Sequence, residues 1–352
     1  MLFMDLHAIL GSMWEDCQLE EFGSGVTGLA MKTSDVDCFA ILPQGVVQNP
    51  TAIVKRTEAA LRRNKNFLNV SALTKTKIPK VHFEHKPTNI FCDLTFSGRN
   101  AVKNSQLLQY LISSDERIRP LMFIIKYWSK INNFTGTCLM SNYCLVLLVV
   151  FYLQQVNILP PIQFLQQNVM EEITDNWNTA FAQIFNLNEN ADVVFTLLRG
   201  FFRYYSNLDF QSNIISLYSG KLIKRKSFTD IQNIPWDYEI YYYNVTKNVC
   251  KALVMDGRLH FCVQDPFQHD RNVGITVRKE TATLIVNRFK HAASIECETE
   301  EFLRYLLLSN TNCKDHKYNE KPKRNFKKPH YLHNSRRAKD GLRHRNKKIS
   351  YM

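Results

Sequence analysis

Three aspartates in the first part of the chain lie in segments with the pattern of β-strands. Asp35 and Asp37 are two residues apart, so in a strand they share one face. Asp93 lies in a second such segment, where its apolar neighbours Cys92 and Leu94 point to the opposite face. If the two strands are neighbours, three carboxylates converge on one site. Hard divalent cations take oxygen ligands, so this pattern predicts two-metal phosphoryl transfer.

A Gly-Ser turn, Gly23-Ser24, precedes the first two aspartates. Glycine lets backbone N–H groups approach a phosphate closely, and the Ser24 hydroxyl can donate to a phosphate oxygen. The chain has no Walker loop, because the pattern G-x-x-x-x-G-K-[ST] does not occur. Taken alone, such a turn is usually a plain loop, and Asp-x-Asp is usually a solvated strand edge or turn. Their order, with strand character around each carboxylate, favours a catalytic site.

The succession of Gly23-Ser24, Asp35-x-Asp37 and a later strand aspartate resembles the signature of the DNA polymerase β-type nucleotidyltransferase superfamily. Further segments resemble its RNA-tailing branch, the terminal uridylyltransferases and cytoplasmic poly(A) polymerases. They are Arg119–Leu121, Ile125–Lys130, Met140–Tyr143, and Asp256-Gly257 followed by the "DPF…NV" segment Val263–Gly274. The resemblance covers about residues 5 to 308. It implies an α+β fold that is bilobal, with a mixed-sheet nucleotidyltransferase palm lobe and a mostly helical poly(A)-polymerase-associated lobe.

The resemblance also implies a nucleotide site on the helices. Asn104 matches the position that hydrogen-bonds the ribose and base. Lys126 and Lys130 lie four residues apart, on one helix face, and match the lysines that bind the triphosphate. Ser141 matches a contact to the γ-phosphate, and Tyr143 matches the aromatic residue that stacks on the base. Without the resemblance, the lysine pair would be read as a solvated helix face and Tyr143 as an ordinary core aromatic.

Base choice is expected to depend on Arg271. The uridylyltransferases that the chain resembles place a His at this position, one residue before the Asn, and a Glu where this chain has Gln268. Uracil presents the acceptor O4 where adenine presents an amino donor, and a guanidinium has donors only. Arg271 therefore favours UTP, and its bulk restricts a purine. The alternative is that Arg271 turns outward, to RNA phosphate or to Asp270.

Together these features predict a template-independent enzyme that adds uridylates from UTP to a single-stranded RNA 3′ end. By the resemblance, Asp35 and Asp37 hold two Mg²⁺ or Mn²⁺ ions, and Asp93 binds the ion that activates the RNA 3′-hydroxyl. The alternatives are a poly(A) polymerase that uses ATP and a non-catalytic RNA-binding adaptor on the same scaffold. A nucleotide-second-messenger synthase shares the carboxylates, but the D-P-F…N-V segment belongs to the tailing branch. A protein partner that delivers the RNA is left open.

Composition agrees with a large intracellular enzyme. The chain has 352 residues, enough for one or two packed domains. Its nine cysteines are scattered without a C-x-x-C, which favours buried reduced thiols over disulfides or zinc. The longest apolar run, Cys144–Leu153, is too short to cross a bilayer, and no N-terminal signal peptide is expected. We therefore expect a cytoplasmic protein that does not contact membranes.

The positive charge is concentrated in the last part of the chain. Of the net charge of +13, residues 311–352 carry +11. Such a polar, basic stretch is expected to be disordered alone. It suits RNA phosphates, with Tyr331 and His333 available for stacking; the alternatives are a nuclear-import signal and a solubilising tail. The expected domains are a catalytic lobe over 1–100, a central and poly(A)-polymerase-associated lobe over 101–308, and the basic tail over 309–352.

Hydrophobic periodicity predicts the elements that position these residues. Helices are expected at Phe3–Trp14, Asn49–Arg63, Val102–Ile112, Arg117–Lys130, Ser141–Leu153, Val193–Tyr205 and Glu280–Ala293. Strands are expected just before Gly23 and at Asp35–Leu42, Phe67–Leu73, Lys80–Glu84, Asn89–Phe96, Ile214–Leu217 and Tyr238–Tyr243. Pro160-Pro161 marks a connection between helices.

Overall fold

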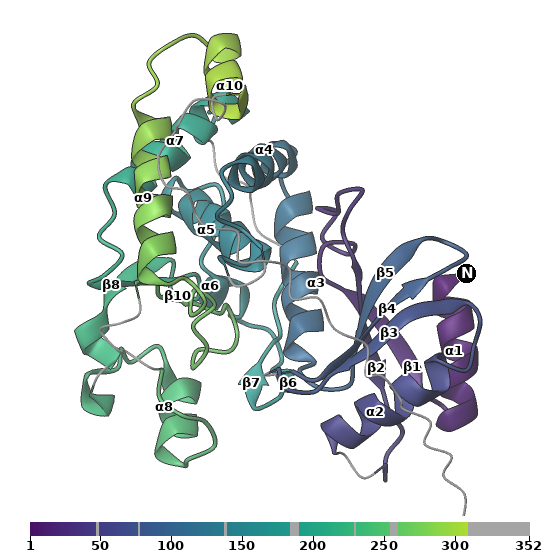
Figure 1. Ribbon diagram of the computed structural model, residues 1–352. Helices are drawn as coiled ribbons and strands as arrows, with labels where there is room; N and C mark the ends of the chain where they lie inside the picture. Colours follow the sequence, from purple (N-terminus) through teal and green to yellow (C-terminus); the bar gives the residue numbers. More distant parts are fainter. Residues whose placement is uncertain are drawn as a thin grey trace, which may run out of the picture. The chain divides into compact units, whose positions relative to one another are not determined.

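The computed structural model describes residues 1–46, 49–76, 78–136, 139–183, 190–228, 230–253 and 260–308 (Figure 1). Its first part contains a five-stranded sheet. The strands are β1 (Gln18–Phe22), β2 (Val36–Ile41), β3 (Phe67–Leu73), β4 (Lys80–His85) and β5 (Ile90–Thr95), in the order β1-β2-β5-β4-β3. β2 and β5 pair in parallel, whereas the other neighbours are antiparallel, so the sheet is mixed.

Two helices, α1 (Leu2–Met13) and α2 (Pro50–Leu61), cover one face of this sheet (Figure 1). Asn49 begins α2, since its side chain accepts hydrogen bonds from the backbone N–H groups of Thr51 and Ala52. The buried cluster between helices and sheet contains Leu6, Leu10, Cys38, Val54, Leu61, Val81, Phe83, Cys92 and Leu94. Strand side chains alternate between faces, so the residues between these apolar ones project from the other face. That face carries the aspartates.

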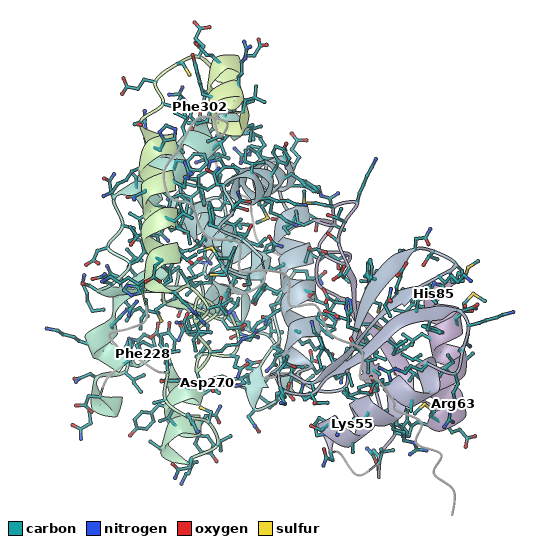
Figure 2. All side chains as sticks on the ribbon, in the orientation of Figure 1. Lys55, Arg63, His85, Phe228, Asp270 and Phe302 are labelled. Atoms are coloured by element: carbon teal, nitrogen blue, oxygen red, sulfur yellow. The ribbon has the colours of Figure 1, made fainter. Side chains whose placement is uncertain are left out.

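A buried histidine fixes the end of β4 to α1. His85, labelled in Figure 2, is fully buried. Its Nε2 lies 3.1 Å from Oδ2 of Asp5. Its Nδ1 lies 2.8 Å from the Thr88 hydroxyl, and the Asn66 amide donates to the same Asp5 oxygen. This network ties the β4–β5 hairpin to the first helix and so holds the strand that carries Asp93.

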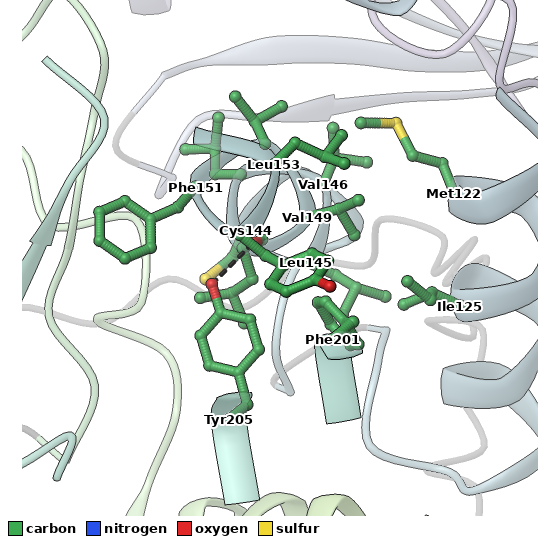
Figure 3. Close-up of a cluster of buried hydrophobic side chains, with 14 of the residues drawn as sticks. Met122, Ile125, Cys144, Leu145, Val146, Val149, Phe151, Leu153, Phe201 and Tyr205 are labelled. Atoms are coloured by element: carbon green, nitrogen blue, oxygen red, sulfur yellow. Dashed lines mark hydrogen bonds between the residues drawn. The ribbon is translucent and has the colours of Figure 1, made fainter. Parts of the chain in front are cut away.

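The rest of the described chain is mostly helical. Its main helices are α3 (Asn100–Ser113), α4 (Ile118–Ile131), α5 (Asn142–Gln155), α7 (Val194–Ser206), α9 (Lys279–Ala293) and α10 (Thr299–Leu308). Every residue of α5 from Cys144 to Gln154 is buried, and the helix is surrounded by apolar side chains of its neighbours (Figure 3). The Tyr205 hydroxyl donates to the Leu148 carbonyl at 2.6 Å, which satisfies the one polar group of that large ring. The long apolar run is therefore a core helix, as predicted.

Smaller elements complete the helical part. A three-stranded sheet has the order β10-β8-β9, with β8 (Asn213–Ser216), β9 (Lys221–Lys224) and β10 (Val263–Gln264). The remaining elements are α6 (Ile162–Leu165), the hairpin β6 (Ile173–Thr174) and β7 (Trp177–Asn178), α8 (Glu239–Thr246), and the 3₁₀ turns at Arg225–Phe228 and Ile231–Asn233. No helix among the described residues is long and apolar enough to cross a membrane.

The predicted α+β class, with a mixed sheet, is confirmed, and so are the seven predicted helices, with ends that differ by a few residues. The strand predicted at Tyr238–Tyr243 is wrong, because this segment enters α8. Tyr238 and Tyr241 are buried whereas Tyr242 and Tyr243 are exposed, which is the spacing of one helix face. Aromatic enrichment suggested a strand, but that preference depends on context. Asp256-Gly257 and the basic tail lie outside the described residues.

Candidate functional site

Two of the predicted aspartates are partners across neighbouring strands. Asp37 of β2 stands opposite Asp93 of β5 in the parallel register, and Asp35 comes one residue before β2 begins. The apolar residues on either side, Cys38, Cys92 and Leu94, are fully buried against the helices. Because the alternate residues face the other way, the strand pairing places the three carboxylates on one side of the sheet.

The neighbouring strand β4 adds two residues that were not predicted from the sequence. Lys80 forms an ion pair with Oδ2 of Asp93, and Nδ1 of His82 lies 2.8 Å from Oδ1 of the same aspartate. His82 is the register partner of Asp93 in the antiparallel pair. The signal was present in the alternation of Lys80, His82 and Glu84 with apolar residues, but it becomes informative only once β4 is known to lie beside β5.

The side chains of this cluster suit a divalent cation. Ligand atoms of Asp35, His82 and Asp93 all lie within 4.8 Å of one another. Burial, and next the negative charge of Asp93, raise the pKa of Asp37 to about 7, even though Lys80 opposes the shift. A crowded carboxylate whose charged form is disfavoured is stabilised by a nearby cation. The residues present therefore fit a metal with oxygen and imidazole ligands.

The Gly-Ser turn lies directly against Asp37. Gly23 follows Phe22, the register partner of Asp37 on β1. It has a φ of +77°, and a Cβ atom there would lie 2.2 Å from Oδ2 of Asp37. Its N–H donates to the Ser105 hydroxyl of α3 at 2.8 Å. The glycine therefore permits both the turn and the close approach of the backbone to the carboxylate.

A cavity of about 450 Å³ joins the carboxylates to the helices. Seven predicted residues line it: Gly23, Ser24, Asp35, Asp37, Lys126, Lys130 and Tyr143. The predicted residues Asp93, Asn104, Ser141 and Arg271 do not line it. The Ser141 hydroxyl instead caps α5, where it accepts a hydrogen bond from the Cys144 N–H at 3.0 Å.

The two lysines of α4 point to the loop that follows the Gly-Ser turn. Lys126 is 6% exposed and donates to the Leu29 carbonyl at 2.6 Å, and Lys130 lies 3.4 Å from the Thr33 hydroxyl. Burial, and then the charge of Lys130, lower the pKa of Lys126. No carboxylate among the described residues lies within ion-pair distance of either lysine. Two neighbouring cations without a counter-charge form a site for an anion.

Asp265 organises the other predicted residues. It is fully buried, and it accepts hydrogen bonds from the Asn104 amide at 3.1 Å and the Tyr143 hydroxyl at 3.2 Å. Nη1 of Arg271 lies 3.5 Å from the same carboxylate, and the guanidinium lies 6.0 Å from the centre of the Tyr143 ring. Arg271 thus points inward to Asp265. Burial and then the charge of Asp265 raise the pKa of Tyr143 well above its ordinary value, so the phenol remains a donor.

Asp265 was not predicted as a site residue. Asp265 is the first residue of the D-P-F segment, which contributed to the family resemblance without indicating a role for this aspartate. Its backbone neighbours complete its coordination, because the N–H groups of Phe267 and Gln268 donate to Oδ1 at 3.2 and 3.1 Å. Five groups thus donate to one buried carboxylate. Two of them belong to α3 and α5, so these bonds hold the loop that carries Asp265 against both helices.

Two family models match the chain. The model described as "Poly(A) RNA polymerase, mitochondrial-like, central palm domain" matches residues 1–113, and "Cid1 family poly A polymerase" matches residues 195–271. The first covers the sheet with its aspartates. The second ends at Arg271 and includes Asp265.

The similar proteins include one that is named as a uridylyltransferase and others that are named as poly(A) polymerases. Terminal uridylyltransferase cid1 of Schizosaccharomyces pombe is 27% identical over an alignment of 299 positions, which covers 80% of this chain and 69% of that protein. Speckle targeted PIP5K1A-regulated poly(A) polymerase of Danio rerio is 26% identical over an alignment of 358 positions, which covers 88% of this chain and 43% of that protein. The chain thus spans less than half the length of the second relative.

Solved structures share the fold. A crystal structure of mtPAP in complex with UTP superposes with a TM-score of 0.71 at 20% identity and covers 86% of this chain and 66% of that one. A structure of the Cid1 poly(U) polymerase with bound Mg 3′-dATP gives a TM-score of 0.66 at 24% identity, over 83% of this chain and 85% of that one. Both likenesses extend over the sheet and the helical part together.

Proposed function

Because this chain belongs to the RNA-tailing branch of the DNA polymerase β-type nucleotidyltransferase superfamily, we propose that it adds nucleotides, chiefly uridylates from UTP, to RNA 3′ ends without a template. One observation carries the proposal. A single cavity joins the Gly-Ser turn, Asp35 and Asp37 to two lysines without counter-charges and to Tyr143. The cavity therefore offers carboxylates that suit metal ions, ammonium groups that suit phosphates, and an aromatic ring that suits a base.

The nucleotide is proposed to lie along the helical wall of this cavity. Lys126 and Lys130 would neutralise the β- and γ-phosphates, since an ammonium is a compact charge on a flexible stem. Tyr143 would stack on the base, held in place by its hydrogen bond to Asp265. Oδ1 of Asn104 is buried and has no partner among the described residues, although its amide donates to Asp265. Asn104 does not line the cavity, so its proposed contact with the ribose rests on the family resemblance.

The carboxylates are proposed to hold the reacting groups. Asp35, Asp37 and Asp93 would bind Mg²⁺ or Mn²⁺, which when bound supplies positive charge to the α-phosphate and lowers the pKa of the RNA 3′-hydroxyl. Lys80 and His82 contact Asp93 and fix the direction of its oxygens. Ser24 at the turn would donate to a phosphate oxygen. Holding the hydroxyl in line with the α-phosphate is then the main contribution of the protein.

Base selection is proposed to rest on Arg271. Its guanidinium has five donors, and one nitrogen, Nη1, faces Asp265, so others remain for the base. Uracil O4 would accept from it, whereas the adenine amino group would face a cation. The position of the guanidinium near the Tyr143 ring supports this placement, because that ring is the proposed stacking surface.

A primer-extension assay tests the proposal. The purified protein would receive a labelled single-stranded RNA, Mg²⁺ or Mn²⁺, and each of the four nucleoside triphosphates separately. A ladder formed mainly with UTP is expected. A ladder formed mainly with ATP would keep the enzyme class and refute the role of Arg271. Folded protein that extends no primer with any nucleotide would contradict catalysis.

Two alternatives follow from particular observations. A poly(A) polymerase is supported by relatives that carry that name and by the ion pair that engages Arg271 with Asp265. A non-catalytic RNA-binding adaptor shares the scaffold, but an adaptor has no need for three carboxylates on one side of the sheet. An RNA-delivering protein partner is compatible with either alternative, and the extension assay separates the enzyme from the adaptor.

We further propose that the chain is divided into a catalytic lobe over residues 1–100, a helical lobe over 101–308 and a basic tail over 309–352. The sheet ends with β5 before residue 100, and α3 begins there, which supports the first boundary. The proposed location is the cytoplasm, and a nuclear one is the alternative if the tail is an import signal. Fluorescence imaging of the tagged full chain and of its tail-deleted form tests the location.

A further inference from the structure

A second cavity, of about 370 Å³, lies in the helical part of the chain. It shares no lining residue with the nucleotide cavity. We call it the acidic aromatic pocket, and its defining residues are Glu171, Trp177, Tyr218, Trp236, Asp237, Glu239 and His269, with Gln163 among the others that line it. None of them has a role in the proposed reaction.

The charged groups of this pocket all have one sign. Glu171, Asp237 and Glu239 line it, and no lysine or arginine does. Within the described part of the chain, no basic residue lies at ion-pair distance from any of the three. This acidic character is local, because residues 1–310 together carry a net charge of about +2. Three unpaired carboxylates around one cavity favour a cation.

One amide that lines the pocket, Gln163, leaves an acceptor without a donor. Oε1 of Gln163 is buried and has no hydrogen-bond partner among the described residues. Gln166, which also lines the pocket, donates its amide hydrogens to the carbonyls of Asn178 and Ala180, at 2.9 and 3.0 Å. A buried acceptor without a donor is costly, so the occupant should supply N–H groups.

The walls of the pocket are aromatic. The imidazole of His269 lies between other rings, 5.3 Å from Trp177 and 4.3 Å from Tyr218 between centroids. His269 is 6% exposed, and Nδ1 has no partner within hydrogen-bond geometry among the described residues. Burial lowers the pKa of His269 to about 3, so the ring is neutral and adds no positive charge. Aromatic faces beside carboxylates are the usual environment of a bound organic cation.

The edge of the pocket carries an exposed indole. Trp236 lines the cavity, and 87% of its surface is accessible. Exposed tryptophans are costly to hydrate and are enriched at the energetic centres of protein–protein interfaces. This feature points to a polypeptide as the source of the cation, since a free small cation would not need a flat apolar surface outside the pocket.

We propose that the acidic aromatic pocket binds an arginine side chain that a partner protein presents. A guanidinium is planar, stacks on aromatic rings and has donors only, which match the carboxylates and Gln163. RNA is disfavoured, because its phosphates would face three carboxylates. Phe267 and His269 line the pocket, and Asp265 and Arg271 of the same segment belong to the nucleotide site. A partner bound here would contact the segment that carries the proposed base-selecting residue.

The test is a binding measurement that needs no catalysis. The full chain would be titrated with a short Gly/Ser peptide that contains one arginine, and tryptophan fluorescence would be recorded. Two of the four tryptophans line the pocket, so the signal reports on it. The matched probe replaces arginine with citrulline, which keeps the shape and removes the charge. Saturable binding of the arginine peptide at roughly millimolar concentration, at least about tenfold tighter than the citrulline peptide, is expected.

Variants locate the site. Glu171→Gln combined with Asp237→Asn should weaken binding of the arginine peptide about tenfold, and Trp236→Ala should weaken it also. All three residues are at least partly exposed, so the fold should tolerate the changes. Glu15→Gln and Tyr305→Ala, on exposed residues that do not line the pocket, are the matched controls and should leave binding unchanged.

Several results would overturn the proposal. They are the absence of saturable binding to wild-type protein, equal binding of the citrulline or a lysine peptide, and variants that bind as wild type does. Displacement of the peptide by a short single-stranded RNA, with equal loss in the pocket variants, would identify a nucleobase site instead. Primer-extension activity does not enter these readouts, so the result is independent of the proposed function.

Discussion

Asp37 and Asp93 stand opposite each other on the parallel strands β2 and β5, yet their surroundings differ. Lys80 and His82 of β4 contact Asp93, whereas Asp37 has no cationic partner among the described residues. Burial and the charge of Asp93 raise the pKa of Asp37 to about 7. The two carboxylates are therefore unequal before any ligand binds. Asp93 is oriented by two neighbours, whereas Asp37 forms no ion pair among the described residues.

Replacement of Asp93 by asparagine should abolish nucleotide addition while leaving the protein folded. The side chain keeps its shape but loses the charge that would bind metal, and a loss of at least about 1000-fold in kcat is expected. Primer extension measures the activity, and circular dichroism measures the fold. Glu84→Gln, on β4 beside the same strand, is the control and should remain active. A folded, fully active Asp93→Asn protein would refute the metal-site assignment.

Gly23→Ala should remove activity through geometry alone. The new Cβ would lie 2.2 Å from Oδ2 of Asp37, and the residue has a φ of +77° that alanine disfavours. A loss of about 1–2 kcal/mol in the free energy of unfolding is expected together with the loss of activity. Urea denaturation and primer extension measure the two effects.

Gly11→Ala is the matched control for that substitution. Gly11 lies within α1, and a Cβ atom there meets nothing within 4 Å. Alanine is favoured over glycine in a helix by about 1 kcal/mol, so this variant should be slightly more stable and fully active. Similar behaviour of the two variants would show that the close approach of Gly23 to Asp37 does not matter.

Arg271→Gln should reduce the preference for UTP over ATP. Glutamine can offer both an acceptor and donors to either base, so the charge that disfavours the adenine amino group is lost. We expect the ratio of kcat/KM for UTP to that for ATP to fall about tenfold, which corresponds to about 1.4 kcal/mol. Arg278→Gln, on an exposed arginine before α9, should leave the ratio unchanged. An unchanged ratio in Arg271→Gln would place base selection elsewhere.

The ion pair of Asp115 and Arg117 predicts a pH dependence of stability. The hydrogen bonds from Arg117 hold the pKa of Asp115 below its usual value, and Nη1 of Arg117 donates to the carbonyls of Asn190 and Asp192 at 2.8 and 2.7 Å. An ionised carboxylate with a lowered native pKa stabilises the folded protein at pH values above the ordinary carboxyl pKa. This stabilisation is lost as the pH falls through the native pKa. Asp115→Asn should thus cost about 1 kcal/mol or less at pH 7, after solvent screening, and this cost should shrink as the pH falls through the lowered native pKa of Asp115.

Urea denaturation across this pH range measures the difference. The neighbouring Glu116 is exposed, so Glu116→Gln should change stability little at any pH. A gap between wild type and Asp115→Asn that stays constant from pH 7 to acid would contradict the role of the ion pair.

Most helices and strands could be predicted from short stretches of sequence, because hydrophobic periodicity and helix-capping residues involve only neighbouring positions. Asn49-Pro50 marked the start of α2, and the alternation around Asp93 gave its face in β5. Contacts between distant residues were not predictable in this way. The ion pair of Lys80 with Asp93 requires β4 to lie beside β5, and the position of Asp265 requires a loop to return to α3 and α5. Strand order and loop placement depend on packing of the whole chain, which one sequence does not display.

Deletion of residues 311–352 should weaken RNA binding and reduce its dependence on salt. These residues carry +11 of the net +13, and each phosphate contact to a cation releases a counterion, so log Kd changes with log salt in proportion to the number of contacts. Filter binding of a single-stranded RNA over a range of salt concentrations gives the slope for both proteins. A full-length form with the tail sequence scrambled keeps the charge and should keep the slope. If deletion leaves the slope unchanged, the RNA contacts lie in residues 1–310, and the tail acts in import or solubility instead.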